Sequence, residues 1–81
     1  MKVVLYTKTE CGLCVKAKQV LKEIQHVYSF EIEEIDIYDN EELLERYQIM
    51  IPVVEIDGKQ AECGVIHKDA IINYIKNAVK S

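Results

Sequence analysis

Apolar and polar residues follow two periods along this chain, one typical of strands and one typical of helices. Residues 2–6 are mostly apolar and include the β-branched Val3 and Val4, which predicts a buried strand. After a polar loop, apolar side chains recur on one side of a helix over about residues 12–25. The members of this stripe are Leu13, Ala17, Val20, Leu21 and Ile24. The chain therefore opens with a strand, a loop and an amphipathic helix.

Alternating residues then predict a second strand over about residues 28–37. The alternation changes parity at Glu33 and Glu34, where we expect a bulge or a change of exposure. The helix between the two strands is long enough for a right-handed crossover, so we expect the strands to be parallel.

A short helix is predicted to follow, opened by Asp39 and Glu42 as a capping pair. Its expected core face consists of Leu43, Leu44 and Tyr47. Asp57 and Gly58 then form a tight-turn signal between two short extended runs, which predicts a hairpin. The two runs are residues 53–56 and 59–63, and a last helix over about 67–79 is expected to bury Ile71, Tyr74, Ile75 and Ala78.

This order, β-α-β-α-β-β-α, predicts an α/β fold. One parallel pair followed by an antiparallel hairpin gives a four-stranded mixed sheet with helices on both faces. A chain of 81 residues is expected to form one domain with one core, spanning residues 1–81. We find no internal repeats and no low-complexity segment.

Two cysteines stand at the junction of the first strand and the first helix. Residues three apart in a first helical turn face the same side, so Cys11 and Cys14 fit the Cα window of roughly 4.4–6.8 Å for a disulfide. A helix N-terminus favours the thiolate, which is the reactive species. We expect Cys11 to be the exposed nucleophile and Cys14 the resolving thiol. Lys8 would promote ionisation of Cys11, and Glu10 would oppose it.

Composition and charge limit the kinds of partner that the chain can bind and the cellular location that we expect for it. The net charge is −4 and no basic run occurs, so we expect no nucleic-acid partner. No apolar run approaches the 18 or so residues of a membrane span. The first strand begins at residue 2 and leaves no room for a signal peptide, which predicts a cytoplasmic chain. We also expect the chain to be a monomer. In a reducing cytosol, a cysteine pair is expected to be catalytic or metal-binding.

The element order, the segment 6–14, and residues 51–54 before Asp57 and Gly58 together resemble the glutaredoxin-like members of the thioredoxin superfamily. The resemblance covers nearly the whole chain. It implies a thioredoxin-like fold and a thiol–disulfide oxidoreductase acting on protein or low-molecular-weight disulfides, in electron transport and cell redox homeostasis. It implies no bound cofactor, with glutathione as a co-substrate or a thioredoxin-reductase-type enzyme as the alternative electron donor.

The resemblance also implies roles for residues outside the cysteine pair. It implies that the Ile51–Pro52 bond is cis, that this loop lies beside the dithiol, and that the Ile51 backbone pairs with a bound thiol substrate. It places Lys8 near a glutathione carboxylate. Gly12 and Leu13, between the cysteines, would contact the substrate or glutathione.

The chain departs from the usual glutaredoxin pattern at two places. Gly12 and Leu13 replace the usual proline and aromatic residue between the cysteines. Glu62 and Cys63 stand where glutaredoxins carry two glycines, and the aspartate that follows those glycines is missing. Glu62 adds negative charge where a glutathione carboxylate would lie, so the electron donor stays open.

Two alternatives use the same residues differently. Cys11, Cys14, Cys63 and His67 formally supply a Cys3His zinc set, or ligands for an iron–sulfur cluster shared between chains. For all four side chains to bind one metal ion, the end of the fourth strand would have to approach the cysteine loop. The second alternative is a redox-inert binding module that keeps the fold without the activity. We expect no metal site if the dithiol interpretation holds.

Overall fold

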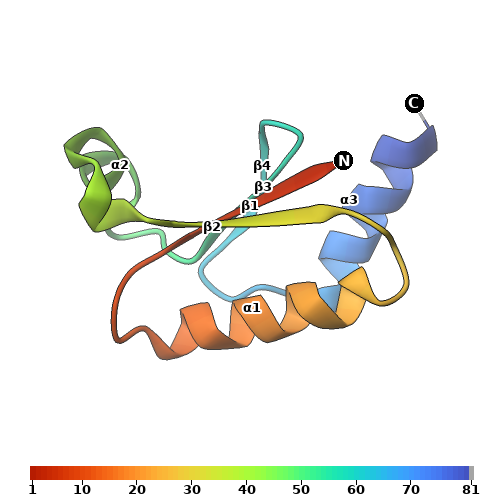
Figure 1. Cartoon of the computed structure of the whole chain (residues 1–81), viewed down its shortest axis with the longest axis horizontal. Coiled ribbons are helices and arrows are strands. Elements are labelled where there is room, and N and C mark those ends of the chain that lie inside the picture. The colour runs from red at the N-terminus through yellow and green to blue at the C-terminus, as the bar shows by residue number, and fades with distance from the viewer. Residues whose placement is uncertain (81) are drawn as a thin grey trace.

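The structure is a computed structural model that describes residues 1–80 (Figure 1). Its elements confirm the predicted order, with one added turn of 3-10 helix. They are β1 (Lys2–Thr7), α1 (Gly12–Gln25), β2 (Glu31–Asp36), η1 (Ile37–Asp39), α2 (Glu41–Tyr47), β3 (Val53–Ile56), β4 (Lys59–Cys63) and α3 (Lys68–Lys80).

The four strands form a mixed sheet in the order β2-β1-β3-β4. Strand β1 pairs in parallel with β2 and antiparallel with β3, and β3 pairs antiparallel with β4. These pairings confirm the predicted α/β fold. They also place β2 and β4 at the two edges, so the central strand β1 leads directly into the cysteine loop.

Helices cover both faces of this sheet, and each face has its own cluster of buried residues, where the sequence had predicted one core. Helices α1 and α3 lie on one face, and α2 lies on the other near one end (Figure 1). Because side chains alternate along a strand, Val3 and Leu5 of β1 pack with the α1 and α3 residues, whereas Tyr6 packs with Tyr47 of α2. No helix within residues 1–80 combines the length and the apolarity that crossing a bilayer requires.

Strand β2 differs from the prediction in its start and its regularity. It begins at Glu31, because the backbone N–H of Tyr28 donates to the Ile24 carbonyl at 2.9 Å and prolongs the end of α1. Its register with β1 is regular across Glu33 and Glu34, so the bulge considered there is absent. The expected change of exposure is present, because Glu33 and Glu34 are both exposed and the next two residues are both half-buried. The 3-10 turn η1 then carries Ile37 into the core.

The predicted capping pair of Asp39 and Glu42 was wrong. Helix α2 begins at Glu41, and its N-cap is Asn40, whose side-chain oxygen accepts from the backbone N–H of Glu42 at 2.9 Å. Asparagine serves as well as aspartate at this position, and the preceding residues are already used in η1.

Leu13 was wrongly assigned to the buried stripe of α1. It is 44% exposed, and Cys14 takes the buried position one residue later. Because α1 begins at Gly12, spacings of three and four residues from Cys14 generate the stripe that faces the sheet. Its buried members are Cys14, Ala17, Leu21 and Ile24.

The hairpin agrees with its prediction, and the last helix agrees in part. Asp57 and Gly58 both have positive φ values, 49° and 84°, as the tight turn between β3 and β4 requires. Helix α3 begins at Lys68, one residue later than expected, and it buries Ile71 and Ile75. Tyr74 and Ala78, which were also expected to be buried, are half-buried.

Candidate functional site

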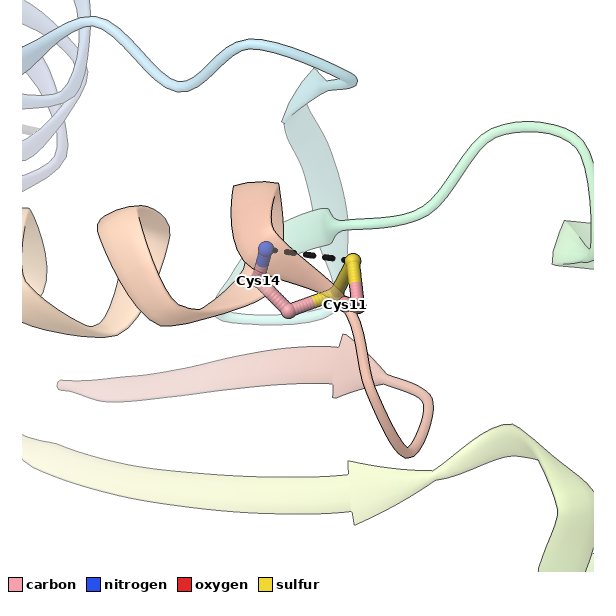
Figure 2. The surroundings of a disulfide bond; sticks show 2 residues. All are labelled: Cys11 and Cys14. Atoms are coloured by element: carbon pink, nitrogen blue, oxygen red, sulfur yellow. Dashed lines mark hydrogen bonds between the residues drawn. A yellow bond between two sulfur atoms is a disulfide. The ribbon is translucent and has the colours of Figure 1, made fainter.

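Cys11 and Cys14 lie at the start of α1 and are joined by a disulfide bond (Figure 2). Cys11 is the N-cap of the helix, with extended backbone angles (φ −113°, ψ 109°). Its sulfur accepts a hydrogen bond from the backbone N–H of Cys14 at 3.2 Å (Figure 2). The Cα atoms are 5.2 Å apart, inside the disulfide window. Very little backbone movement is therefore needed to open or close the bond.

The two sulfur-bearing side chains differ in exposure. Cys14 belongs to the buried face of α1 and is only 5% exposed, whereas Cys11 is half-buried at the tip of the helix. This difference follows from the helix start, because the first turn carries Cys11 outward and Cys14 inward. An incoming disulfide can therefore reach Cys11 more easily than Cys14.

A cleft of about 340 Å³ adjoins the pair. It is lined by Thr7, Lys8, Glu10, Cys11, Gly12, Cys14, Val15, Lys18 and Glu34. Lys18 of α1 and Glu34 of β2 form an ion pair of 3.0 Å within this lining. Sequence reasoning missed this pair, because only the regular β1–β2 register shows that Glu34 faces the helix. The structure places Lys8 and Gly12 on the same cleft as the cysteines.

Leu13, the second of the two residues between the cysteines, does not line that cleft. Leu13 is exposed on the first turn of α1, and Val15 and Val65 are also large exposed apolar side chains, 57% and 56% accessible. Such side chains suit contact with an apolar surface of a partner better than contact with a small anion.

The Ile51–Pro52 peptide bond is cis. Val53 pairs with Tyr6, so the next position on each strand brings Pro52 beside Thr7, where β1 enters the cysteine loop. Pro52 is buried and Ile51 is half-buried. The proline loop and the dithiol therefore lie at the same end of the sheet.

The loop containing Ile51 is tied to both neighbouring elements. The Gly64 N–H at the end of β4 lies within hydrogen-bond distance of the Met50 carbonyl (3.0 Å) and the Pro52 carbonyl (2.9 Å). The Ile51 N–H donates to the Tyr47 carbonyl at 3.1 Å. Within residues 1–80 the Ile51 carbonyl has no hydrogen-bond donor. Of the two Ile51 backbone groups, the carbonyl is thus the one available to a ligand.

Glu62 and His67 form a contact that sequence reasoning did not foresee. One Glu62 oxygen accepts from the backbone N–H of His67 at 2.8 Å, and the other lies 2.7 Å from His67 Nδ1. His67 directly precedes α3, so a carboxylate of the chain itself caps this helix. The signal available in sequence was the spacing of an acid and a histidine around Gly64.

The alternative metal set is not gathered in the structure. No group of three or more His, Cys, Asp or Glu side chains is arranged to hold a metal ion in the part of the chain that the structure describes. Cys63 is an exposed free thiol at the end of the edge strand β4, and His67 is engaged with Glu62.

On the other face of the sheet, two tyrosines share one carboxylate. The rings of Tyr6 and Tyr47 have centroids 4.7 Å apart, and the Tyr47 hydroxyl donates to Glu55 at 3.3 Å. Burial, followed by the nearby Glu55 carboxylate, raises the pKa of both phenols above the usual value. The sequence indicated packing roles for both tyrosines and gave no sign of the shared carboxylate.

Comparison with known proteins agrees with this geometry. Residues 2–76 match the family described as Glutaredoxin-like domain. A thioredoxin from Methanocaldococcus jannaschii is 30% identical over 79 residues, covering 94% of this chain and 93% of the relative.

Solved structures show the same fold. A protein from Nitrosomonas europaea, solved by NMR, superposes with a TM-score of 0.80 at 31% identity, covering 90% of this chain and 88% of that one. Thioredoxin 1 from Thermosipho africanus gives a TM-score of 0.64 at 17% identity, covering 96% and 98%. The likeness to that thioredoxin concerns the fold alone. By sequence match, fold and cysteine pair, this chain belongs to the glutaredoxin-like family of the thioredoxin superfamily.

Proposed function

We propose that the chain is a thiol–disulfide oxidoreductase that reduces disulfides through Cys11 and Cys14. The observation that carries this proposal is the position of the Cys11 sulfur, at the N-cap of α1 and 3.2 Å from the Cys14 N–H. When the disulfide is reduced, that N–H and the helix dipole favour a thiolate at Cys11. The accessible sulfur is therefore also the activated one.

The proposed reaction has two exchange steps. The Cys11 thiolate attacks one sulfur of a substrate disulfide, forms a mixed disulfide and expels the other substrate sulfur as a thiolate. Cys14, as its thiolate, then attacks the Cys11 sulfur and expels the second substrate thiolate. Two electrons pass from the protein to the substrate, which takes up two protons, and the chain is left with the disulfide between Cys11 and Cys14. A dithiol donor, or two thiols, restores the reduced pair.

Charges along the cleft would tune the first step. Lys8 makes no ion pair within the described residues and can lie close to a thiolate on Cys11. Lys18 is partly neutralised by Glu34, and Glu10 opposes the negative charge. We therefore assign Lys8 the larger stabilising effect on the Cys11 thiolate, screened by solvent because the side chain is exposed.

The chemistry around the site favours a protein disulfide as substrate. The exposed apolar side chains Leu13, Val15 and Val65 suit a partner surface. The N-terminus of α3 already holds the Glu62 carboxylate, which leaves less room and more negative charge for an anionic peptide such as glutathione. We propose a reductase of the thioredoxin-reductase type as the main donor, glutathione as a weaker co-substrate, and a monomer acting in the cytoplasm without a bound cofactor.

A donor comparison tests the proposal. Reduction of a protein disulfide is followed with either thioredoxin reductase and NADPH or glutathione and its reductase. We expect the first system to support faster turnover. Cys11→Ser should abolish turnover with both donors, whereas Cys14→Ser should accumulate mixed disulfides that are visible by mass spectrometry. Cys63→Ser is the matched control and should turn over normally.

Two results would contradict the assignment. Unchanged multiple turnover in both the Cys11→Ser and Cys14→Ser variants would rule out these roles. Faster turnover with glutathione than with the reductase would overturn the proposed order of donors while leaving the dithiol chemistry intact.

A further inference from the structure

Tyr47 holds the loop of Ile51 and Pro52 through its backbone. Its carbonyl oxygen accepts hydrogen bonds from the N–H of Met50 at 2.8 Å and from the N–H of Ile51 at 3.1 Å. Because both bonds end on one oxygen, the position of Tyr47 decides where the first half of the loop lies. Any tilt of this residue would move the Ile51 peptide group.

The side chain of Tyr47 is held in turn by the sheet. It is 5% exposed, its ring lies 4.7 Å from that of Tyr6, and its hydroxyl donates to Glu55 at 3.3 Å. Tyr6 belongs to β1 and Glu55 to β3, and these paired strands border the position of Pro52. The ring and the hydroxyl thus link the end of α2 to the two central strands.

We infer that Tyr47 is a positioning residue, held by Tyr6 and Glu55, that orients the Ile51 carbonyl toward a bound disulfide substrate. This inference rests on the proposed function, because it requires substrate to lie along Ile51 during thiol–disulfide exchange. The Ile51 N–H is already bonded to Tyr47, so the direction of the carbonyl decides how well the substrate backbone can pair. Tyr47 lies on the face of the sheet opposite α1, so it acts on substrate affinity and leaves the sulfur chemistry unchanged.

Tyr47→Phe tests the inference because it keeps the ring and the backbone carbonyl and removes only the hydroxyl. With insulin as the disulfide substrate, we expect KM to rise about tenfold, with kcat within about twofold of the wild-type value. The reduction potential of the cysteine pair should not change. Glu55→Ala should reproduce this pattern, whereas Glu55→Gln keeps an oxygen acceptor and should restore a KM near that of wild type. Tyr38→Phe, at an exposed tyrosine, is the matched control.

Amide hydrogen exchange supplies a readout that does not depend on activity. We expect the Met50 and Ile51 amides to exchange faster in Tyr47→Phe than in wild type or Tyr38→Phe. A wild-type KM in the Tyr47→Phe variant would overturn the inference alone, whether or not exchange accelerates. Unchanged exchange would overturn it as well, because the hydroxyl would then not hold the loop. Failure of the wild-type protein to reduce any disulfide would overturn the proposed function itself.

Discussion

The carboxylate of Glu62 reaches both the backbone N–H and the Nδ1 atom of His67, at 2.8 and 2.7 Å. The N-terminus of a helix attracts anions, and at α3 the chain supplies its own. This contact gives a physical reason to expect weak use of glutathione, which carries two carboxylates of its own.

Glu62→Gln removes this negative charge and keeps an oxygen that can cap α3. We expect the rate of exchange with oxidised glutathione to rise up to about fivefold, as removal of one charge near a helix terminus implies. Exchange with the uncharged hydroxyethyl disulfide should not change. Glu31→Gln is the control, because Glu31 lies at the other end of the sheet. An equal increase in the exchange rate in the Glu62→Gln and Glu31→Gln variants would contradict a local effect of Glu62, because net charge alone would then explain the change.

Lys8→Gln is expected to make the Cys11 thiolate harder to form. The measurement is the pH profile of iodoacetamide alkylation of the reduced protein, in a Cys63→Ser background so that only the site cysteines are free to react. The midpoint should move upward by roughly 0.5 pH unit, and added salt should shrink the difference. Lys22→Gln, on α1 and outside the cleft lining, should leave the profile unchanged. A profile identical in all three proteins would exclude the assigned role of Lys8.

Two glycines allow a matched test of backbone strain beside the site. Gly64 has φ +76°, and its N–H bonds the end of β4 to the proline loop, whereas Gly12 lies in α1. An added Cβ would meet no atom within 4 Å at either position, so the two glycines differ in backbone conformation and not in available space. Gly64→Ala should therefore destabilise the fold by about 1–2 kcal/mol through conformation alone. Gly12→Ala should be neutral or stabilising by up to about 1 kcal/mol. Urea unfolding of both variants checks the difference, and similar midpoints would contradict it.

The shared carboxylate of Tyr6 and Tyr47 predicts a loss of stability in alkali. Because burial and Glu55 raise the pKa of both phenols in the folded protein, the unfolded chain loses these protons first. The stabilisation is complete below pH of about 10 and falls as the pH rises above that value. Urea midpoints between pH 8 and 11 should fall less steeply in Tyr6→Phe and Tyr47→Phe than in wild type. A parallel fall in all three proteins would contradict the prediction, and Tyr38→Phe controls for loss of an exposed phenol.

Local patterns were sufficient to predict most of the fold. The β-branched run of β1, the tight turn at Asp57 and Gly58, and the three-residue spacing of the cysteines each depend on neighbouring residues. The errors occurred where two elements meet within a few residues. Asn40 replaced Asp39 as the cap because η1 had already used the preceding residues, and periodicity alone could not show that turn.

Only part of the site could be predicted from the sequence, for a related reason. Cys11 and Cys14 carry their geometry in their spacing, whereas the Lys18–Glu34 ion pair and the contact between Glu62 and His67 depend on strand register and on the start of α3. Tyr47 illustrates the same limit, because its role comes from a hydrogen bond to Glu55 on a different strand. Such contacts require the assembled sheet.

The most direct test of the dithiol is a redox titration of the Cys63→Ser variant. The protein is equilibrated across a series of dithiothreitol buffers, the free thiols are alkylated, and the products are counted by mass. We predict that Cys11 and Cys14 become protected from alkylation together as the buffer becomes more oxidising. In this single two-electron transition, a tenfold change in the ratio of oxidised to reduced protein corresponds to about 30 mV. Two thiols that stay free at every potential, or that react independently of each other, would contradict the account.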